Sequence, residues 1–237
     1  MLNTQVKKYG KYVLRNFVNL FFPTLCAGCS RVIHHKETVC SACRLTLPYL
    51  QTDKEQEALM LKFAGREPIA YVYAYLHFEK RSVVQKLIHR LKYKGRKELG
   101  QELGRWFGEE LNGKQTKVNE ADMFIPVPIH PLREQQRGYN QSEWIANGLA
   151  AAMNVPSRTD IMKRTKFVAS QTKKNRLDRW QNVASVFDVT NPDTVKDKHV
   201  VIVDDIITTG ATLEACAIAL REAGAKTIGI ITIAATR

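Results

Sequence analysis

Hydrophobic residues recur along this chain in two patterns, as short apolar runs and as stripes with helical spacing. The runs predict strands over 69–76, 123–127, 199–203 and 227–233. The stripes predict helices over 82–91, 97–111, 141–153 and 212–223. Asn140 followed by Glu143 resembles a capping box before the third of these helices, and Gly224 ends the fourth.

The order of these elements indicates the fold class. The two C-terminal strands are apolar enough to be buried on both faces, as the strands of a parallel sheet are. A strand, a helix and a second strand at this spacing form a βαβ unit with a right-handed crossover. The sequence therefore predicts an α/β fold with a mainly parallel sheet that is flanked by helices.

The N-terminal part of the chain has a different composition. We divide the chain into residues 1–50, a connector at 51–68 that is polar at first, and the α/β domain at 69–237. Apolar residues within 1–23 recur at helical spacing, which predicts a helix that packs on the protein or binds a membrane surface or a partner. No apolar run approaches the ~18–20 residues of a membrane helix, and a secretory signal is not recognisable. A cytoplasmic protein without a membrane span is expected.

Four of the five cysteines form two Cys-x-x-Cys pairs, Cys26 with Cys29 and Cys40 with Cys43. Two such turns can close a tetrahedral shell of sulfurs around Zn²⁺, so the sequence predicts a structural zinc module within residues 1–50. Disulfides and an iron–sulfur cluster are the alternatives, and the expected compartment disfavours disulfides. A site made of four thiolates has no open position for a substrate, so this metal would fold the module rather than catalyse a reaction.

The chain is strongly basic, with 36 Lys and Arg against 23 Asp and Glu and a formal net charge of +13. Most of the excess lies in the middle of the chain. Residues 80–97 hold eight basic residues and no acid, and residues 163–179 hold seven against a single aspartate. This distribution favours a polyanionic partner, either a nucleic acid or a phosphorylated small molecule.

Two adjacent acids, Asp204 and Asp205, follow the apolar run of the third strand. They fall where a parallel strand feeds a loop, at the sheet edge where α/β proteins bind ligands, and they are expected to face solvent. The next residues are small or hydroxylated and start a helix, which suits a phosphate; they are Thr208, Thr209, Gly210, Ala211 and Thr212. We expect the acids to bind neighbouring sugar hydroxyls, and a bulky residue at position 210 to obstruct the phosphate. The alternative is that Asp205 merely caps the helix.

This segment resembles the 5-phosphoribosyl-1-diphosphate (PRPP) signature of type I phosphoribosyltransferases, which has two acids after an apolar strand and then Thr-Thr-Gly-x-Thr. Further motifs are similar to those of the ComF family of competence proteins, and of its ComFC-like members in particular. Besides the paired Cys-x-x-Cys turns they are Leu91-Lys92-Tyr93-Lys94-Gly95, Ile125-Pro126-Val127-Pro128, Arg137-Gly138-Tyr139-Asn140-Gln141, Arg164-Thr165 with Gln171, and Arg179 with Asn182. The resemblance covers about residues 20–237. One departure is Lys174, which stands where a Leu is expected after Gln171.

The resemblance implies a type I phosphoribosyltransferase-like fold and a site for PRPP with Mg²⁺. Asp204 and Asp205 would act as the catalytic acids on the ribose hydroxyls, and the loop 208–212 would hold the 5′-phosphate. The departing pyrophosphate needs cations and amides. The candidates for this are Lys92, Val127, Pro128, Ile129, His130, Arg137, Arg164 and Arg179. For Arg164 and Arg179 a solvated surface position is the alternative, and for His130 an ordinary loop histidine.

Three functions are compatible with these residues. The first is a PRPP-binding accessory protein of DNA uptake in natural transformation, which handles single-stranded DNA or docks on a helicase of the DNA-uptake or replication-restart machinery. The second is phosphoribosyl transfer to a nucleobase or a nucleic-acid end. The third is a sensor in which a ribose phosphate only sets a conformation. We favour the first function, with turnover open, because no pattern in the sequence identifies an acceptor.

Overall fold

The computed structural model describes residues 23–50, 52–65, 67–165 and 186–236. The chain divides after Leu47 into two compact units, residues 1–47 and residues 48–237. Several predictions fall wholly or mostly outside the described residues, namely the helix within 1–23, most of the basic stretch 163–179, the departure at Lys174 and the role of Arg179. Each unit is described by itself below.

In the N-terminal unit, each cysteine pair lies on a turn of its own. Leu25 and Val32 form an antiparallel bridge that encloses the first Cys-x-x-Cys turn. The second pair lies at the start of helix α2 (Ser41–Leu45). Cys40 is the N-cap of this helix, and its sulfur accepts a hydrogen bond from the amide of Cys43 at 3.4 Å. Each pair of sulfurs is therefore positioned by the local backbone, the first pair by a turn and the second by the start of α2.

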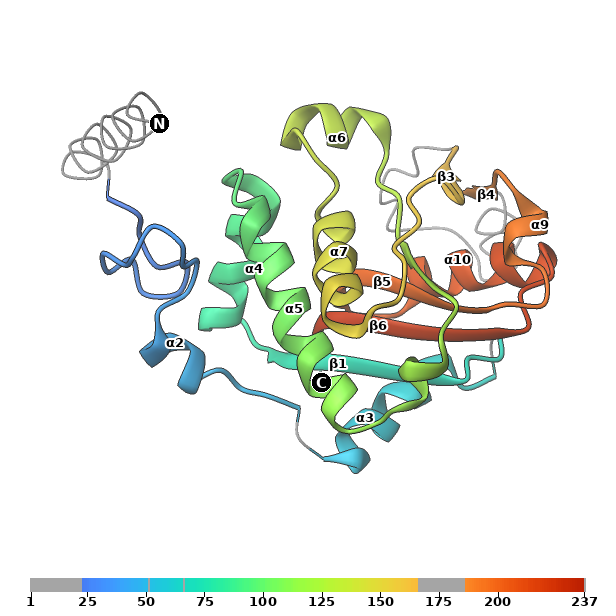
Figure 1. The fold of residues 1–237 in the computed structure, drawn as a ribbon, viewed down its shortest axis with the longest axis horizontal. Helices are drawn as coiled ribbons and strands as arrows, with labels where there is room; N and C mark the ends of the chain where they lie inside the picture. The colour runs from blue at the N-terminus through green and yellow to red at the C-terminus, as the bar shows by residue number, and fades with distance from the viewer. Residues whose placement is uncertain (1–22, 51, 66, 166–185, 237) are drawn as a thin grey trace, which may run out of the picture. The chain divides into compact units, whose positions relative to one another are not determined.

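The second unit is built on a four-stranded sheet in which each neighbouring pair of strands is parallel (Figure 1). In order across the sheet, the strands are β1 (Tyr71–Phe78), β6 (Thr227–Thr236), β5 (His199–Ile207) and β2 (Met123–Pro126). A separate antiparallel pair consists of β3 (Met162–Arg164) and β4 (Phe187–Val189). The predicted α/β architecture with a parallel sheet is confirmed.

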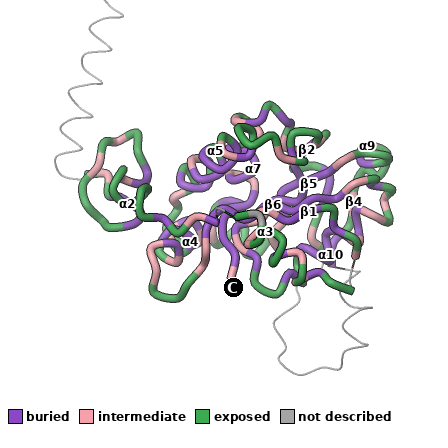
Figure 2. Tube along the Cα trace, turned by 90° about the horizontal axis from the view of Figure 1, so that it is seen from below, coloured by how far each residue is buried: buried purple, intermediate pink, exposed green. Residues whose placement is uncertain are grey.

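Helices cover both faces of the sheet, as their apolar stripes require. One face carries α4 (Val83–Tyr93), α5 (Lys97–Gly113) and α7 (Gln141–Met153), and the other carries α3 (Asp53–Met60) and α10 (Ala211–Glu222). Figure 2 shows α5 and α7 on one side of the buried strands and α10 on the other. The remaining short elements are η1 (Leu61–Phe63), η2 (Lys117–Glu120), α6 (Pro131–Arg137) and α9 (Pro192–Val195). Among the helices that the structure describes, none combines the length and the apolar character needed to cross a bilayer.

The central strands are longer than their apolar runs predict. β5 continues past Val203 to Ile207, because its backbone keeps pairing with β6 up to that residue. β6 likewise extends to Thr236, since it pairs with β1 on one side and with β5 on the other. Asp204 and Asp205 therefore lie within a paired strand, whereas the sequence placed them just beyond its end.

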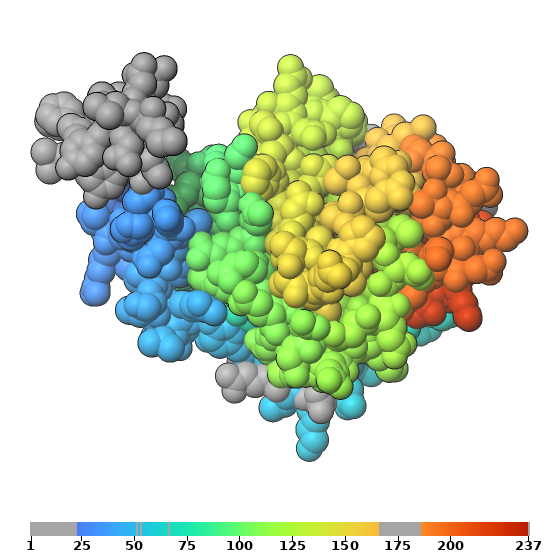
Figure 3. Space-filling model, viewed as in Figure 1, coloured from blue at the N-terminus to red at the C-terminus, as the bar shows by residue number. Residues whose placement is uncertain are grey.

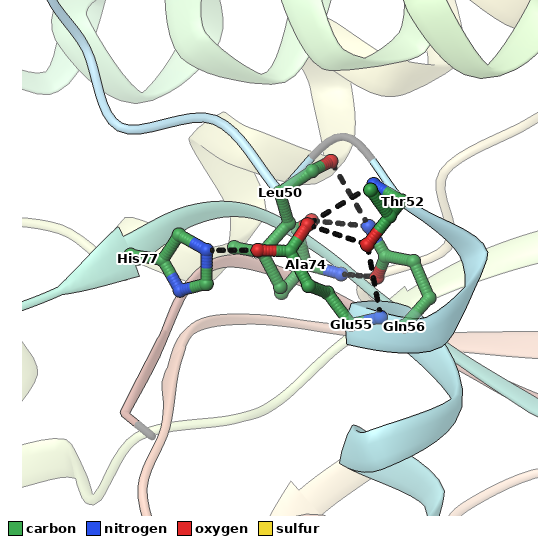
Figure 4. Close-up of polar contacts among 6 residues, drawn as sticks. All are labelled: Leu50, Thr52, Glu55, Gln56, Ala74 and His77. Carbon is green, nitrogen blue, oxygen red and sulfur yellow. Dashed lines mark hydrogen bonds and ion pairs between the residues drawn. The ribbon is translucent and has the colours of Figure 1, made fainter.

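The segment predicted as a connector, 51–68, contributes to the second unit. Leu59 and Phe63 are buried in the same hydrophobic core as the inner face of α10. Gln56 of α3 binds the outer edge of β1 (Figure 4): its side-chain amide accepts from the N–H of Ala74 and donates to the carbonyl of the same residue, both at 3.0 Å. These two hydrogen bonds pair backbone groups at the edge of β1 that a further strand would otherwise pair.

A short polar network holds α3 at this edge. Thr52 and Glu55 form a capping box in which each side chain binds the backbone amide of the other. A carboxylate oxygen of Glu55 also lies 2.8 Å from Nε2 of His77 on β1 (Figure 4). The start of the helix and the strand are thus joined directly.

Helices α5 and α7 approach each other more closely than ordinary side chains allow, and Figure 3 shows them side by side on one face of the second unit. A methyl group at Gly104 in α5 would overlap the backbone of Ile145 in α7. A methyl group at Gly148 in α7 would overlap the backbone of Gln101 in α5. Both positions therefore require glycine, because the backbones of α5 and α7 are too close there for a side chain. Because α7 also packs on β2 and β5, this contact positions the start of α7 against the sheet.

We expect Gly104→Ala to destabilise the protein by about 1–3 kcal/mol, because the added methyl group forces two packed helices apart. The matched control is Gly113→Ala in the same helix, where an added Cβ would meet nothing within 4 Å. This control should be neutral or slightly stabilising, because alanine favours a helix more than glycine does. Urea unfolding of both variants measures the difference, and equal stabilities would contradict the close contact.

Candidate functional site

The candidate site lies at the carboxyl end of β5, where the chain enters α10. Asp204, Ile206, Ile207 and the stretch 208–213 line a small cavity of about 50 Å³. Thr208 and Thr209 are exposed, and α10 begins at Ala211. Four of the five predicted phosphate-binding residues are therefore exposed, while Gly210 between them is buried. The stretch lies at the amides and the positive dipole end of a helix.

Gly210 is required by the backbone and by the core behind it. Its φ of +80° lies in the left-handed region that favours glycine, and it forms the N-cap of α10. A Cβ at this position would lie 3.0 Å from the ring of Phe63. A bulky residue here would therefore strain the turn and clash with Phe63. These two effects already require glycine at position 210, before any effect on a bound phosphate is considered.

The two acids are more buried than the sequence suggested. Asp205 is 2% exposed and Asp204 is partly buried, so the expectation that both face solvent is wrong. The cause is the continuation of β5 beyond Val203. One carboxylate oxygen of Asp204 accepts hydrogen bonds from the hydroxyl of Ser142 and from the amide of Asp205, both at 2.8 Å. Burial, and then the charge of Asp205, raise the pKa of Asp204 to about 7, although Lys92 and these hydrogen bonds act in the opposite direction.

Lys92, a predicted pyrophosphate ligand, contacts the second acid. Its ammonium lies 2.9 Å from Oδ1 of Asp205. The same lysine, in the last turn of α4, also lines a cavity of about 320 Å³ whose other lining residues are Tyr93, Gly95, Arg133, Gln136 and Arg137. The acids therefore adjoin a basic cavity, with Lys92 as the shared residue.

The predicted pyrophosphate loop, Val127 to His130, follows β2 directly beside the acids. The amide of Val127 donates to the carbonyl of Val203 at 2.9 Å, which continues the pairing of β2 with β5. Val127 is buried, and the next three residues are partly exposed. His130 is the N-cap of α6, where its Nδ1 accepts from the amide of Leu132 at 3.2 Å. His130 thus caps α6 at the point where the loop ends and the helix begins.

The predicted arginine ligands have different surroundings. Arg137 donates to the side chain of Gln141 at 2.7 Å, and its guanidinium lies over the ring of Tyr93. Arg164 lies over the ring of Phe187, and burial, followed by the charge of Arg133, lowers its pKa. Asp204 raises the same pKa, but its effect is the smallest and does not outweigh those of burial and Arg133.

The sequence missed residues that hold the acids and the loop. Ser142, which is fully buried, binds Asp204, and the side-chain amide of Asn140 donates to the carbonyl of Val127 at 3.0 Å. Asn140 does cap α7, but its side chain accepts from the amide of Ser142 and not as the predicted capping box requires. A buried polar pair at the start of a helix is a weak signal in a sequence, because the partners in β5 and β2 are distant along the chain.

The four cysteines of the N-terminal unit converge on one point. Their sulfurs all lie within 4.8 Å of one another, and none of these cysteines forms a disulfide. Amides of Gly28 and Cys40 approach the sulfur of Cys26, each at 3.3 Å. This set of soft ligands, at this spacing and with amide donors to the sulfur, could hold a metal ion such as zinc.

The acidity of the sulfurs is consistent with a cation site. Burial raises the pKa of Cys26, but backbone hydrogen bonds from Cys40, Cys29 and Gly28 outweigh this effect and lower it to about 6. Burial, followed by hydrogen bonds from the neighbouring sulfurs, raises the pKa of Cys43 to about 12. Like charges on sulfurs this close to one another would repel, and a bound cation would offset that repulsion.

The acid pair of the second unit also offers ligands for a cation. Oδ2 of Asp205 is buried and has no hydrogen-bond partner among the residues that the structure describes. Carboxylate oxygens are the ligands that Mg²⁺ prefers, and a buried oxygen without a partner is a place where a cation lowers the cost of burial. The residues present therefore fit a divalent cation.

Comparisons with known proteins agree with this arrangement. Residues 140–237 match the phosphoribosyl transferase domain. Competence protein F of Haemophilus influenzae is 26% identical, with 87% of this chain and 88% of its own length covered. DNA utilization protein YhgH of Escherichia coli strain K12 is 27% identical with the same coverage, and competence protein ComFC of Bacillus subtilis is 28% identical over 60% of this chain and 55% of its own length. Residues 140–237 thus resemble a phosphoribosyl transferase domain in an α/β fold of that type, and the chain is similar over most of its length to the proteins named competence protein F and DNA utilization protein YhgH.

Proposed function

We propose that this chain binds PRPP, or a related ribose phosphate, at the junction of β5 and α10. The observation that carries this proposal is the pairing of two largely buried acids with an exposed, small-residue helix start only a few residues further on. A sugar phosphate has this combination of groups, with neighbouring hydroxyls for the acids and a phosphate for the amides. A structural role for Asp205 alone as a helix cap does not account for the arrangement, because Gly210 occupies the N-cap position.

Each part of the site has a separate task in this proposal. Asp204 and Asp205 accept hydrogen bonds from the ribose hydroxyls, and Ser142 orients Asp204. The loop 208–212 and the first turn of α10 hold the 5′-phosphate. When bound, Mg²⁺ would be held by the acid pair and would offset the charge of the diphosphate. Lys92, Arg137 and the loop that begins at Val127 border the space for that diphosphate.

The biological setting that we propose is DNA uptake and the processing of single-stranded DNA in the cytoplasm. Relatives that are similar to this chain over most of its length are named for competence and DNA utilization. The surface beside the site supports a polyanionic partner, because the end of α4 and α6 present basic side chains around Tyr93, which is 61% exposed. An aromatic ring among cations is the arrangement with which proteins bind single strands.

Turnover is a second candidate function, and the cavity next to the acids favours it. A space of about 320 Å³ lined by cations is large enough for a leaving diphosphate. Pyrophosphate release from PRPP, measured with a panel of nucleobases and oligonucleotides, tests this candidate. Release with one acceptor class would establish a transferase, and tight binding without release would leave the accessory role.

We expect Asp204→Asn to weaken the binding of PRPP with Mg²⁺ by about 10- to 100-fold, because a charged hydrogen-bond acceptor is lost. The fold should persist, since Asn can still accept from Ser142 and from the amide of Asp205. Asp188→Asn, in the exposed part of β4, is the matched control and should bind as the unchanged protein does. Isothermal titration calorimetry measures all three proteins. Unchanged affinity in Asp204→Asn would remove the ribose site from this position.

We also propose that the cysteine cluster holds a structural zinc ion. Cys26→Ser should then lower the zinc content from about one ion per chain, because one of four thiolate ligands is lost. Cys216→Ala is the control: it removes a buried cysteine of the second unit and should keep the zinc. Metal analysis of the purified proteins gives the stoichiometry, and a full zinc content in Cys26→Ser would rule out the four-thiolate assignment.

Binding of single-stranded DNA should depend strongly on salt. If about four phosphates are neutralised, affinity for an oligonucleotide should fall about 50-fold between 50 and 200 mM salt. Tyr93→Ala should cost roughly 1–3 kcal/mol through lost stacking, whereas Tyr93→Phe keeps a ring and should bind nearly normally. Fluorescence anisotropy measures both effects. Affinity that does not change with salt would contradict the electrostatic part of the proposal.

A further inference from the structure

Lys92 stands between two environments of opposite charge. Its ammonium pairs with Oδ1 of Asp205 at 2.9 Å, and its side chain is 21% exposed. The same side chain borders the cavity that also contains Arg133 and Arg137. Lys92 belongs to the last turn of α4, and Gly95, just beyond the helix, has a left-handed φ of +64°. A long side chain at this position can serve either the carboxylate or the cavity.

The acid pair needs a positive charge because it is largely buried. Asp204 is stabilised by neutral donors, the hydroxyl of Ser142 and a backbone amide. Within the described part of the chain, Lys92 makes the ion pair that reaches these acids. A single ammonium offsets one of two carboxylates, and it leaves Oδ2 of Asp205 buried without a hydrogen-bond partner among the described residues. The site is thus neutralised only in part.

We propose that Lys92 is a resident counterion which a divalent cation displaces from Asp205. The inference rests on the proposed function, because the acids that would hold the cation are those of the proposed ribose-phosphate site. A doubly charged ion can offset both acids and supply a partner for the second oxygen of Asp205, which the ammonium does not do. The displaced lysine then has a place to go, since its side chain already borders the basic cavity.

Displacement would couple the two halves of the site. Before the cation binds, Lys92 compensates the buried acids and keeps its charge out of the cavity. After it binds, the charge of Lys92 adds to those of Arg133 and Arg137, where a diphosphate would lie. One side chain would therefore serve the empty and the loaded protein in turn, and cation binding would prepare the cavity for the anion.

The test is a calorimetric titration of the sugar-free protein with MgCl₂. If the ion pair is formed about nine-tenths of the time, the competition weakens the apparent affinity for Mg²⁺ about tenfold. Lys92→Met keeps most of the aliphatic stem and removes the competitor, so it should bind Mg²⁺ about tenfold more tightly than the unchanged protein. Affinity that is unchanged or lower in Lys92→Met would overturn the proposal.

Lys94→Met is the matched control for a general effect of charge. Lys94 lies two residues further on, is exposed, and forms the C-cap of α4. It loses the same charge without touching Asp205, so its affinity for Mg²⁺ should stay within about twofold of the unchanged protein. An equal gain in both variants would show an unspecific field effect and would also overturn the proposal.

A second measurement needs no variant and decides the matter if Lys92→Met fails to fold. Acetylation of the unchanged protein, read by peptide mass spectrometry, reports the accessibility of Lys92 relative to Lys94. Addition of MgCl₂ should raise the labelling of Lys92 several-fold, and an unchanged ratio would contradict displacement. Both measurements omit ribose phosphates. A failure of PRPP to bind would therefore refute the proposed function. The Mg²⁺ titration and the acetylation would still show whether a cation displaces Lys92.

Discussion

The burial of two adjacent carboxylates within a paired strand is the constraint on which this site depends. Such groups stay charged only when donors or cations compensate for the lost water. Here the compensation comes from two helices: Ser142 of α7 binds Asp204, and Lys92 of α4 binds Asp205. The positions of these helices are set elsewhere, by the glycine contact between α5 and α7 and by the hydroxyl of Tyr139, which donates to the carbonyl of Leu91. Packing remote from the acids therefore positions the side chains that compensate for their burial.

Local patterns in the sequence predicted most of the fold, because each strand and helix has its own apolar spacing. The lengths of the central strands could not be predicted in this way. β5 runs on to Ile207 because β6 continues to offer partners, and the composition of 204–207 does not show this. The wrong expectation that Asp204 and Asp205 face solvent follows from the same limit, since burial of a polar residue in a strand is decided by its neighbours across the sheet.

In the candidate site, too, the features formed by neighbouring residues could be predicted, and those formed by distant segments could not. The two Cys-x-x-Cys turns and the loop 208–212 could be recognised because their residues are close together in the chain, and each forms its geometry locally. Ser142, by contrast, is 62 positions from the acid that it binds, and Phe63 lies behind Gly210 although it comes from a segment that reads as a connector. Contacts between residues that are far apart in the chain leave no local pattern in a single sequence, so they could not be predicted.

The separation of charges in the second unit explains why a chain with a net charge of +13 keeps two acids at this edge. A phosphorylated sugar makes opposite demands, since its hydroxyls favour carboxylates while its phosphates are repelled by them. In the proposed binding mode, different elements of the fold meet these two demands. The acids lie in β5, uncharged amides lie at the start of α10, and the cations Lys92, Arg133 and Arg137 lie on α4 and α6. In that binding mode the basic residues would offset the field of the acids where phosphates approach, while the acids would remain near enough to bind hydroxyls.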